Sequence, residues 1–194
     1  NINILPTGQY KGQITQYFSG YSGVEERRKI ASIGIEKFKN DLVKGNPDMQ
    51  ISDFEIINLD STENALQIKL STLIGEEQEV DRLYLNPVFA NRTISNPFKN
   101  INRIFPVDFG IPMDESYIAN LTIPAGFMIE ELPKNIALSL PNGAAKFMSA
   151  LQVTENVIQF SSRLSIRNTQ FSPEDYHTLR ELYDKIIAKH SELL

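Results

Sequence analysis

The stretch RIFPVDFGIPMDESYIANLTIPAGFMIEELP, residues 103–133, decides how the rest of the chain is organised, because prolines and glycines divide it into short apolar runs. Pro106 and Pro112 bracket the run VDFGI, and residues 117–123 alternate in the manner of a strand. The turn PAG at 124–126 follows, with Gly126 free to take a positive φ. The stretch predicts extended structure that enters and leaves through turns.

Strands continue on the C-terminal side. Residues 136–140, 146–153 and 157–166 have strand character, and the turns PNG and TEN separate them. Three consecutive strands joined by tight turns predict a meander.

A helix and a hairpin are expected on the N-terminal side. Residues 9–18 predict a strand in which Gly12 marks a bulge or a close approach of another backbone. Ser22 and Glu25 form a capping-box pattern ahead of a helix over residues 24–44, within which Gly34 suggests close packing onto a sheet. Gly45 and Pro47 are stop signals for that helix.

Residues 50–74 predict an antiparallel hairpin, because two runs of alternating character flank the polar segment DSTEN. A further strand is expected over residues 80–85. Residues 86–102, with five asparagines and two prolines, predict a loop with one helical turn.

The C-terminal helix has the clearest local signals. Ser172 and Asp175 form a capping box, Pro173 occupies the first helical position, and Phe171 can pack on Tyr176. A helix of about 18 residues is expected to dock on a sheet through one apolar face. That face comprises Tyr176, Leu179, Tyr183, Ile186 and Ile187.

Together these elements predict an α+β, mainly β domain. The expected form is an antiparallel β-sandwich-like domain with one N-terminal and one C-terminal helix packed on the sheet. Residues 1–48 read as a linker strand and helix, and residues 49–194 as the mainly antiparallel domain, with one continuous domain over 1–194 as the alternative.

Composition excludes several classes. A net charge of −5 and a pI near 5.1 argue against a nucleic-acid surface, which needs clustered Lys and Arg. No apolar run approaches the roughly 20 residues needed to cross a bilayer. The start at Asn1, without a signal pattern, suggests an excised fragment whose export signal would lie elsewhere.

Candidate catalytic chemistry is sparse. The chain has no cysteine, and its two histidines, His177 and His190, have no acidic or histidine partner at the helical spacing of a metal site, apart from the weak pair of His177 with Glu181. No cofactor or metal motif is present in the sequence. Acidic residues gather in the opening stretch. The favoured interpretation is that they cap turns, and the alternative is that Asp108 and Asp114 belong to a carboxylate-dependent hydrolase. The acidic residues are Asp108, Asp114, Glu115, Glu130 and Glu131.

Aromatic residues near the N-terminus offer the only candidate binding residues. Tyr10, Tyr17 and Tyr21 could stack on a sugar or a peptide, because exposed aromatic patches commonly mark interaction sites. Strand alternation sends Tyr17 and Phe18 to opposite faces, so at least one of them is expected in the core.

Four segments carry a resemblance to a known family. They are GQYKGQITQYFSGYSGVEERR (8–28), RIFPVDFGIP (103–112), LTIPAGFMIEELPKNIALSLPNGAAKF (121–147) and FSPEDYHTLRELYDKIIAKHSE (171–192). The last three resemble the C-terminal domain of unknown function that follows a transglutaminase-like domain in multidomain bacterial proteins. The first is similar to the segment that links the two.

The resemblance implies a non-catalytic accessory domain. Its partners would be the transglutaminase-like and N-terminal domains of the same polypeptide, whose papain-like Cys, His and Asp would perform acyl transfer or peptide hydrolysis. Export to the periplasm or cell surface is implied by the resemblance alone. The alternative is a carbohydrate- or peptide-binding β module that uses exposed aromatic residues or a free sheet edge.

Overall fold

The computed structural model describes residues 1–44, 48–78 and 81–194, which form two compact units. The first unit comprises Asn1–Asp81 with Thr122–Ala125, and the second comprises Arg82–Leu121 with Gly126–Leu194. The described residues are mainly β and contain three α-helices, so the predicted α+β, mainly β class is confirmed. The sandwich-like stacking of sheets stays a prediction.

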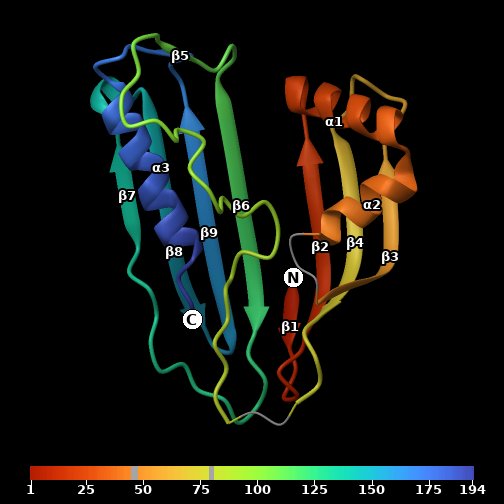
Figure 1. The fold of residues 1–194 in the computed structure, drawn as a ribbon. Helices are drawn as coiled ribbons and strands as arrows, with labels where there is room; N and C mark the ends of the chain where they lie inside the picture. The colour runs from red at the N-terminus through yellow and green to blue at the C-terminus, as the bar shows by residue number, and fades with distance from the viewer. Residues whose placement is uncertain (45–47, 79–80) are drawn as a thin grey trace. The chain divides into compact units, whose positions relative to one another are not determined.

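The first unit is built on an antiparallel sheet in the order β3-β4-β2-β1 (Figure 1). The predicted hairpin is confirmed, since β3 and β4 pair antiparallel. Alternate residues of β4, from Leu66 to Thr72, are buried, which leaves the intervening ones on a wetter face. The four strands are β1 (Ile2–Ile4), β2 (Tyr10–Phe18), β3 (Met49–Ile57) and β4 (Leu66–Ile74).

Gly12 of β2 lies close to the backbone at the start of β1. It pairs with Ile2, and a Cβ atom built on Gly12 would lie only 2.1 Å from the carbonyl oxygen of Asn1. The register of β2 continues without a shift through this position. Of the two predicted roles for Gly12, close backbone approach is therefore confirmed and a bulge is wrong.

The predicted single helix over 24–44 is wrong, because the structure contains two helices, α1 (Gly20–Ile33) and α2 (Ile35–Val43). Gly34 separates them with φ 83° and ψ 156°, a conformation that only glycine adopts without strain. A Cβ atom added to Gly34 would meet nothing within 4 Å. This glycine therefore ends a helix instead of packing on a sheet. The stop signals Gly45 and Pro47 lie outside the described residues.

The predicted capping box at the start of α1 is also wrong. The N-cap is Ser19, with no side-chain cap, and the Ser22 hydroxyl donates to the Ser19 carbonyl at 2.8 Å. Tertiary contact fixes this helix instead, through Arg27. Its Nε donates to the Leu59 carbonyl at 3.0 Å, and its Nη2 donates to the Asn58 carbonyl at 2.8 Å. The guanidinium thus ties α1 to the loop between β3 and β4.

The second unit contains the predicted meander, in a sheet ordered β6-β9-β8-β7. Strands β7, β8 and β9 pair antiparallel in sequence order, and a separate short pair joins β5 to β10. The strand predicted over 80–85 is wrong for residues 81–85, which form none, while Val80 lies outside the described residues. The strands are β5 (Val107–Asp108), β6 (Met113–Thr122), β7 (Ile136–Ser139), β8 (Ala145–Thr154), β9 (Val157–Ile166) and β10 (Gln170–Phe171).

Helix α3 (Tyr176–His190) packs on this sheet, as predicted (Figure 1). It is shorter than expected, because residues 173–175 form a turn, although the Asp175 amide still donates to the Ser172 hydroxyl at 3.3 Å. Ile187 is only half-buried. The buried face is also wider than predicted and ends in two polar residues. It comprises Tyr176, Leu179, Leu182, Tyr183, Ile186, Lys189 and His190.

Candidate functional site

An irregular segment, residues 85–100, runs beside α3 and is here called the strap (Figure 1). It contains two Asn-Pro turns. The Oδ1 atom of Asn86 accepts from the Val88 amide at 2.9 Å, and the Oδ1 atom of Asn96 accepts from the Phe98 amide at 2.9 Å. Each asparagine closes its own turn while its Nδ2 group stays free to donate elsewhere.

The Nδ2 groups of these two asparagines donate to α3. Asn86 donates to the carbonyl of His190 at 2.8 Å, and Asn96 donates to the carbonyl of Arg180 at 2.9 Å. Because the earlier asparagine contacts the later helical residue, the strap runs antiparallel to α3. The carbonyls at the C-terminal end of a helix lack intrahelical partners, so Asn86 also caps α3.

Phe98 anchors the strap in the core. Its ring makes edge-on contacts with Tyr176 and Tyr183 of α3 and with Phe109, at centroid distances of 5.8, 5.1 and 6.3 Å. Its carbonyl accepts from the Arg180 Nε atom at 3.0 Å. The predicted loop at 86–102 is confirmed, its helical turn is wrong, and the segment is an integral layer of the core.

His190, one of the two histidines of the chain, lies buried where α3, the strap and β9 meet. Its Nδ1 atom lies 3.3 Å from the backbone amide of Thr93, and its Nε2 atom lies 2.9 Å from the hydroxyl of Ser162. An amide can only donate, so Nδ1 must accept and the ring proton sits on Nε2. Burial, and secondarily the nearby Arg92, lowers the pKa of His190 from its ordinary value.

This tautomer has a chemical consequence. In a serine nucleophile pair the histidine accepts the hydroxyl proton through an unprotonated nitrogen, while a third group that accepts a hydrogen bond orients the ring. Here Nε2 donates to Ser162, and the third group is an amide of Thr93 that donates. The pair is arranged to hold three segments together, with the polarity opposite to that of a general base. The other histidine, His177, is exposed on α3.

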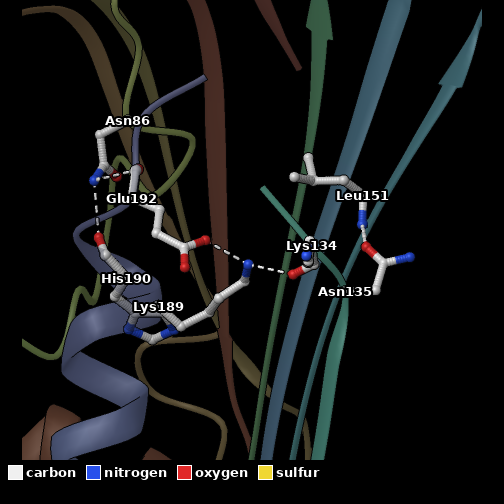
Figure 2. A network of polar contacts seen from close by, with 7 residues as sticks. All are labelled: Asn86, Lys134, Asn135, Leu151, Lys189, His190 and Glu192. Carbon is white, nitrogen blue, oxygen red and sulfur yellow. Dashed lines mark hydrogen bonds and ion pairs between the residues drawn. The ribbon is translucent and has the colours of Figure 1, made fainter. Parts of the chain in front are cut away.

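Lys189 forms a second polar cluster beside His190 (Figure 2). Its ammonium group is almost fully buried and contacts both the Glu192 carboxylate and the Lys134 carbonyl. The next residue, Asn135, accepts from the Leu151 amide through Oδ1 at 2.7 Å. The segment before β7 is therefore held both by the end of α3 and by β8. Burial of Lys189 is tolerated because its charge is paired with Glu192 and it donates to the Lys134 carbonyl.

The three predicted binding tyrosines are separated by strand geometry. Tyr10 and Tyr17 lie seven positions apart on the uninterrupted strand β2, which places them on opposite faces. Tyr17 and Tyr21 are exposed, at 66% and 67%, whereas Tyr10 is half-buried. Phe18 packs against the core of the first unit, as alternation requires.

Three acidic residues of the opening stretch have clear structural partners, and one of them, Glu130, pairs with Arg82 at 3.0 Å. Asp108 accepts from the Gly110 amide at 2.7 Å, which is the turn-capping role predicted for it, and that amide is the main cause that lowers its pKa. Asp114 accepts two hydrogen bonds from Arg163, which lower the pKa of this carboxyl. A general acid needs a raised pKa, so the lowered pKa values of Asp108 and Asp114 suit neither carboxyl to that one role.

Among residues 1–44, 48–78 and 81–194 no group of three His, Cys, Asp or Glu side chains could hold a metal ion. Within the same part of the chain no helix has the length and apolar character needed to cross a membrane. Sequence reasoning missed Asn86, Asn96 and Ser162 as organising residues. The repeated Asn-Pro dipeptide was the available signal for the first two.

Comparison with protein-family models identifies a match for part of the chain. A family model described as "Domain of Unknown Function with solved-structure structure (DUF3858)" matches residues 81–194. No curated protein and no solved structure matches the chain. The matched residues span more than half of the chain and include the strap, the meander and α3.

Proposed function

The chain belongs to the DUF3858 family, and we propose that it is a non-catalytic accessory domain that packs on a transglutaminase-like domain or presents partners to it. The observation that carries this proposal is the polarity of the His190 site, where a backbone amide fixes the tautomer that cannot deprotonate Ser162. The absence of cysteine from the sequence supports it further, because a papain-like reaction needs a thiolate.

The proposed setting follows from the sequence resemblance to the domain that follows a transglutaminase-like domain in multidomain bacterial proteins. A papain-like Cys, His and Asp would be supplied by another domain of the same polypeptide, in the periplasm or at the cell surface. This chain would contribute a folded surface and no reacting group. The proposal predicts that the gene encoding the chain also encodes such a Cys, His and Asp set upstream of Asn1.

An activity assay tests the non-catalytic role. The purified chain is incubated with casein for peptide hydrolysis, and with a glutamine-containing dipeptide and hydroxylamine for acyl transfer. The expected rate equals the buffer blank in both assays. A rate above the blank that is lost in Ser162→Ala, while the exposed-site variant His177→Ala retains it, would overturn the proposal.

Exposed aromatic residues favour a second candidate, a carbohydrate- or peptide-binding module. Tyr17 and Tyr21 are both about two-thirds exposed, which is unusual for large aromatic side chains without a partner. They lie four residues apart, one at the end of β2 and one in the first turn of α1. A sugar ring or an extended peptide could stack on such rings.

A binding assay separates this candidate from the first. Saturable binding on a glycan array or a peptide array, lost in Tyr17→Ala and Tyr21→Ala, would favour the binding module. The matched control is Tyr84→Ala, which removes an equally exposed tyrosine of the second unit and should leave such binding unchanged. Unfolding curves identical to wild type would show that the losses are local.

A further inference from the structure

An open groove of about 390 Å³ lies in the second unit, at one end of β6, β8 and β9. Strand register explains its lining. Lys146 pairs with Ser165 and Met148 pairs with Arg163, so alternation places all four on one face of the sheet. The intervening Phe147 is buried on the face that α3 covers. The groove therefore belongs to the face away from α3.

Positive charge gathers in this groove although the chain as a whole carries −5. Lys146, Arg163 and Arg167 line it with a single acidic residue, Asp114. Asp114 holds Arg163 through hydrogen bonds of 3.0 and 2.6 Å. In the part of the chain that the structure describes, Lys146 and Arg167 join no close ion pair, although Arg167 interacts with Asp114 over a longer distance, so both cations can face a ligand.

Apart from Ser165, the rest of the lining is apolar and adaptable. Met113, Met148 and Pro112 contribute to it, and methionine side chains adjust to irregular partners. The volume falls in the range of about 300 to 1,000 Å³ that is usual for small-ligand sites. A ligand that fits both parts of the lining has an anionic group beside an apolar body.

We propose that this groove binds an acidic peptide segment in which a bulky apolar side chain adjoins a carboxylate. The exposed guanidinium of Arg167 can take the carboxylate as a bidentate partner, and the Lys146 ammonium can add a second contact. A peptide supplies both required parts, a carboxylate and an adjoining apolar side chain, and a phosphate ester, which the same cations attract, is tested beside it. Binding here does not depend on the role proposed beside a transglutaminase-like domain.

Titration of the ¹⁵N-labelled chain with defined probes tests the proposal. The acidic probe is acetyl-Glu-Phe-Glu-amide, its neutral match is acetyl-Gln-Phe-Gln-amide, and the phosphate probe is phenyl phosphate. We expect saturable shifts of the groove amides with the acidic peptide, and about tenfold weaker binding of the neutral one. Tighter binding of phenyl phosphate would overturn the peptide assignment, and an acidic peptide that moves no groove amide at millimolar concentration would overturn the site.

Charge variants sharpen the test, because the groove cations are exposed and their replacement leaves the core intact. Lys146→Gln and Arg167→Gln should each weaken the acidic peptide by roughly 3- to 10-fold. The matched controls Lys99→Gln and Arg28→Gln remove exposed cations elsewhere and should not. Asp114→Asn, which releases Arg163, should tighten binding. If the groove and control variants weakened binding equally, binding would depend only on the net charge of the protein, which would contradict the proposal.

Discussion

The Nε2 atom of His190 lies 2.9 Å from the Oγ atom of Ser162, on a neighbouring strand, beneath the end of α3. On the other side of the ring, Nδ1 faces the amide of Thr93 in the strap. Only the neutral ring can satisfy both contacts, since protonation would place a second donor against a backbone N–H. One imidazole therefore joins a helix, a strand and an irregular segment.

A pH dependence of stability follows from this site. Burial holds the pKa of His190 below the ordinary value of 6.5 that the unfolded chain recovers. As the pH falls below about 6.5, the unfolded state takes up a proton that the folded state refuses, so the free energy of unfolding decreases. The stability that neutral His190 contributes is fully present above pH 6.5 and is lost as the pH falls towards the lower pKa of His190 in the folded state. Urea unfolding midpoints measured from pH 7.5 to 5 should fall accordingly.

Two histidine variants separate this effect from general acid sensitivity. His190→Gln removes the titrating ring and should flatten the pH dependence, whereas His177→Gln, at an exposed position of the same helix, should preserve it. An unchanged pH dependence in His190→Gln would assign the effect to other groups.

Loss of either Asn-Pro contact should loosen the strap. Asn86→Ala or Asn96→Ala leaves a helix carbonyl and a turn amide without their partner, which costs about 1 to 3 kcal/mol in the free energy of unfolding. Hydrogen exchange of the Val88 and Phe98 amides should accelerate in the corresponding variant. Asn102→Ala, at an exposed position beyond the strap, serves as the control and should match wild type. Wild-type exchange rates in both strap variants would contradict the clamp.

The docking of α3 on the sheet can be tested by replacing two adjacent isoleucines, Ile186 and Ile187. Ile186 is 1% exposed and belongs to the core, so Ile186→Ala should cost about 2 to 4 kcal/mol. Ile187 is half-buried, and Ile187→Ala should cost clearly less. Equilibrium denaturation that gives equal losses, or a loss below about 1 kcal/mol for Ile186→Ala, would mean that the helix is not docked through this face.

Gly12→Ala should displace β1 from β2. The new methyl group would meet the carbonyl oxygen of Asn1, and a backbone atom cannot move aside as a flexible side chain can. Overpacking of this kind costs about 1 to 3 kcal/mol, and the amides of β1 should lose protection from exchange. Gln13→Ala, the next and exposed residue of the strand, should leave β1 in place. Retained protection of β1 in Gly12→Ala would contradict the close approach.

Local signals predicted the elements that depend on neighbouring residues. The turns at Pro141–Gly143 and at Glu155 predicted the three-stranded meander. Ser172 and Pro173 predicted the start of the last helix to within a few residues. The sequence pattern did not predict the helix break at Gly34, because apolar residues continue at spacings of three and four across it. The spacing of apolar residues shows which face of a helix is apolar, but it does not show where the helix axis changes direction.

Features that depend on distant residues could not be read from the sequence. The groove cations come from positions 146, 163 and 167, and only the pairing of β8 with β9 brings them together. Likewise, Thr93, Ser162 and His190 share no local pattern. The resemblance predicted a domain of unknown function, which the family match confirms, and its link to a transglutaminase-like domain stays a prediction. The strap and the groove could be described only from the fold.

The antiparallel strap has a consequence for how the chain tolerates insertions. Asn86 and Asn96 are ten residues apart, and so are their partners His190 and Arg180. Ten helical residues span only about 15 Å, whereas ten extended residues can reach roughly 33 Å. The strap between its two anchors therefore contains slack, and a residue added there can be absorbed. A residue added to α3 between Arg180 and His190 rotates one carbonyl by about 100° away from its asparagine, so length variation is expected in the strap and not in the helix.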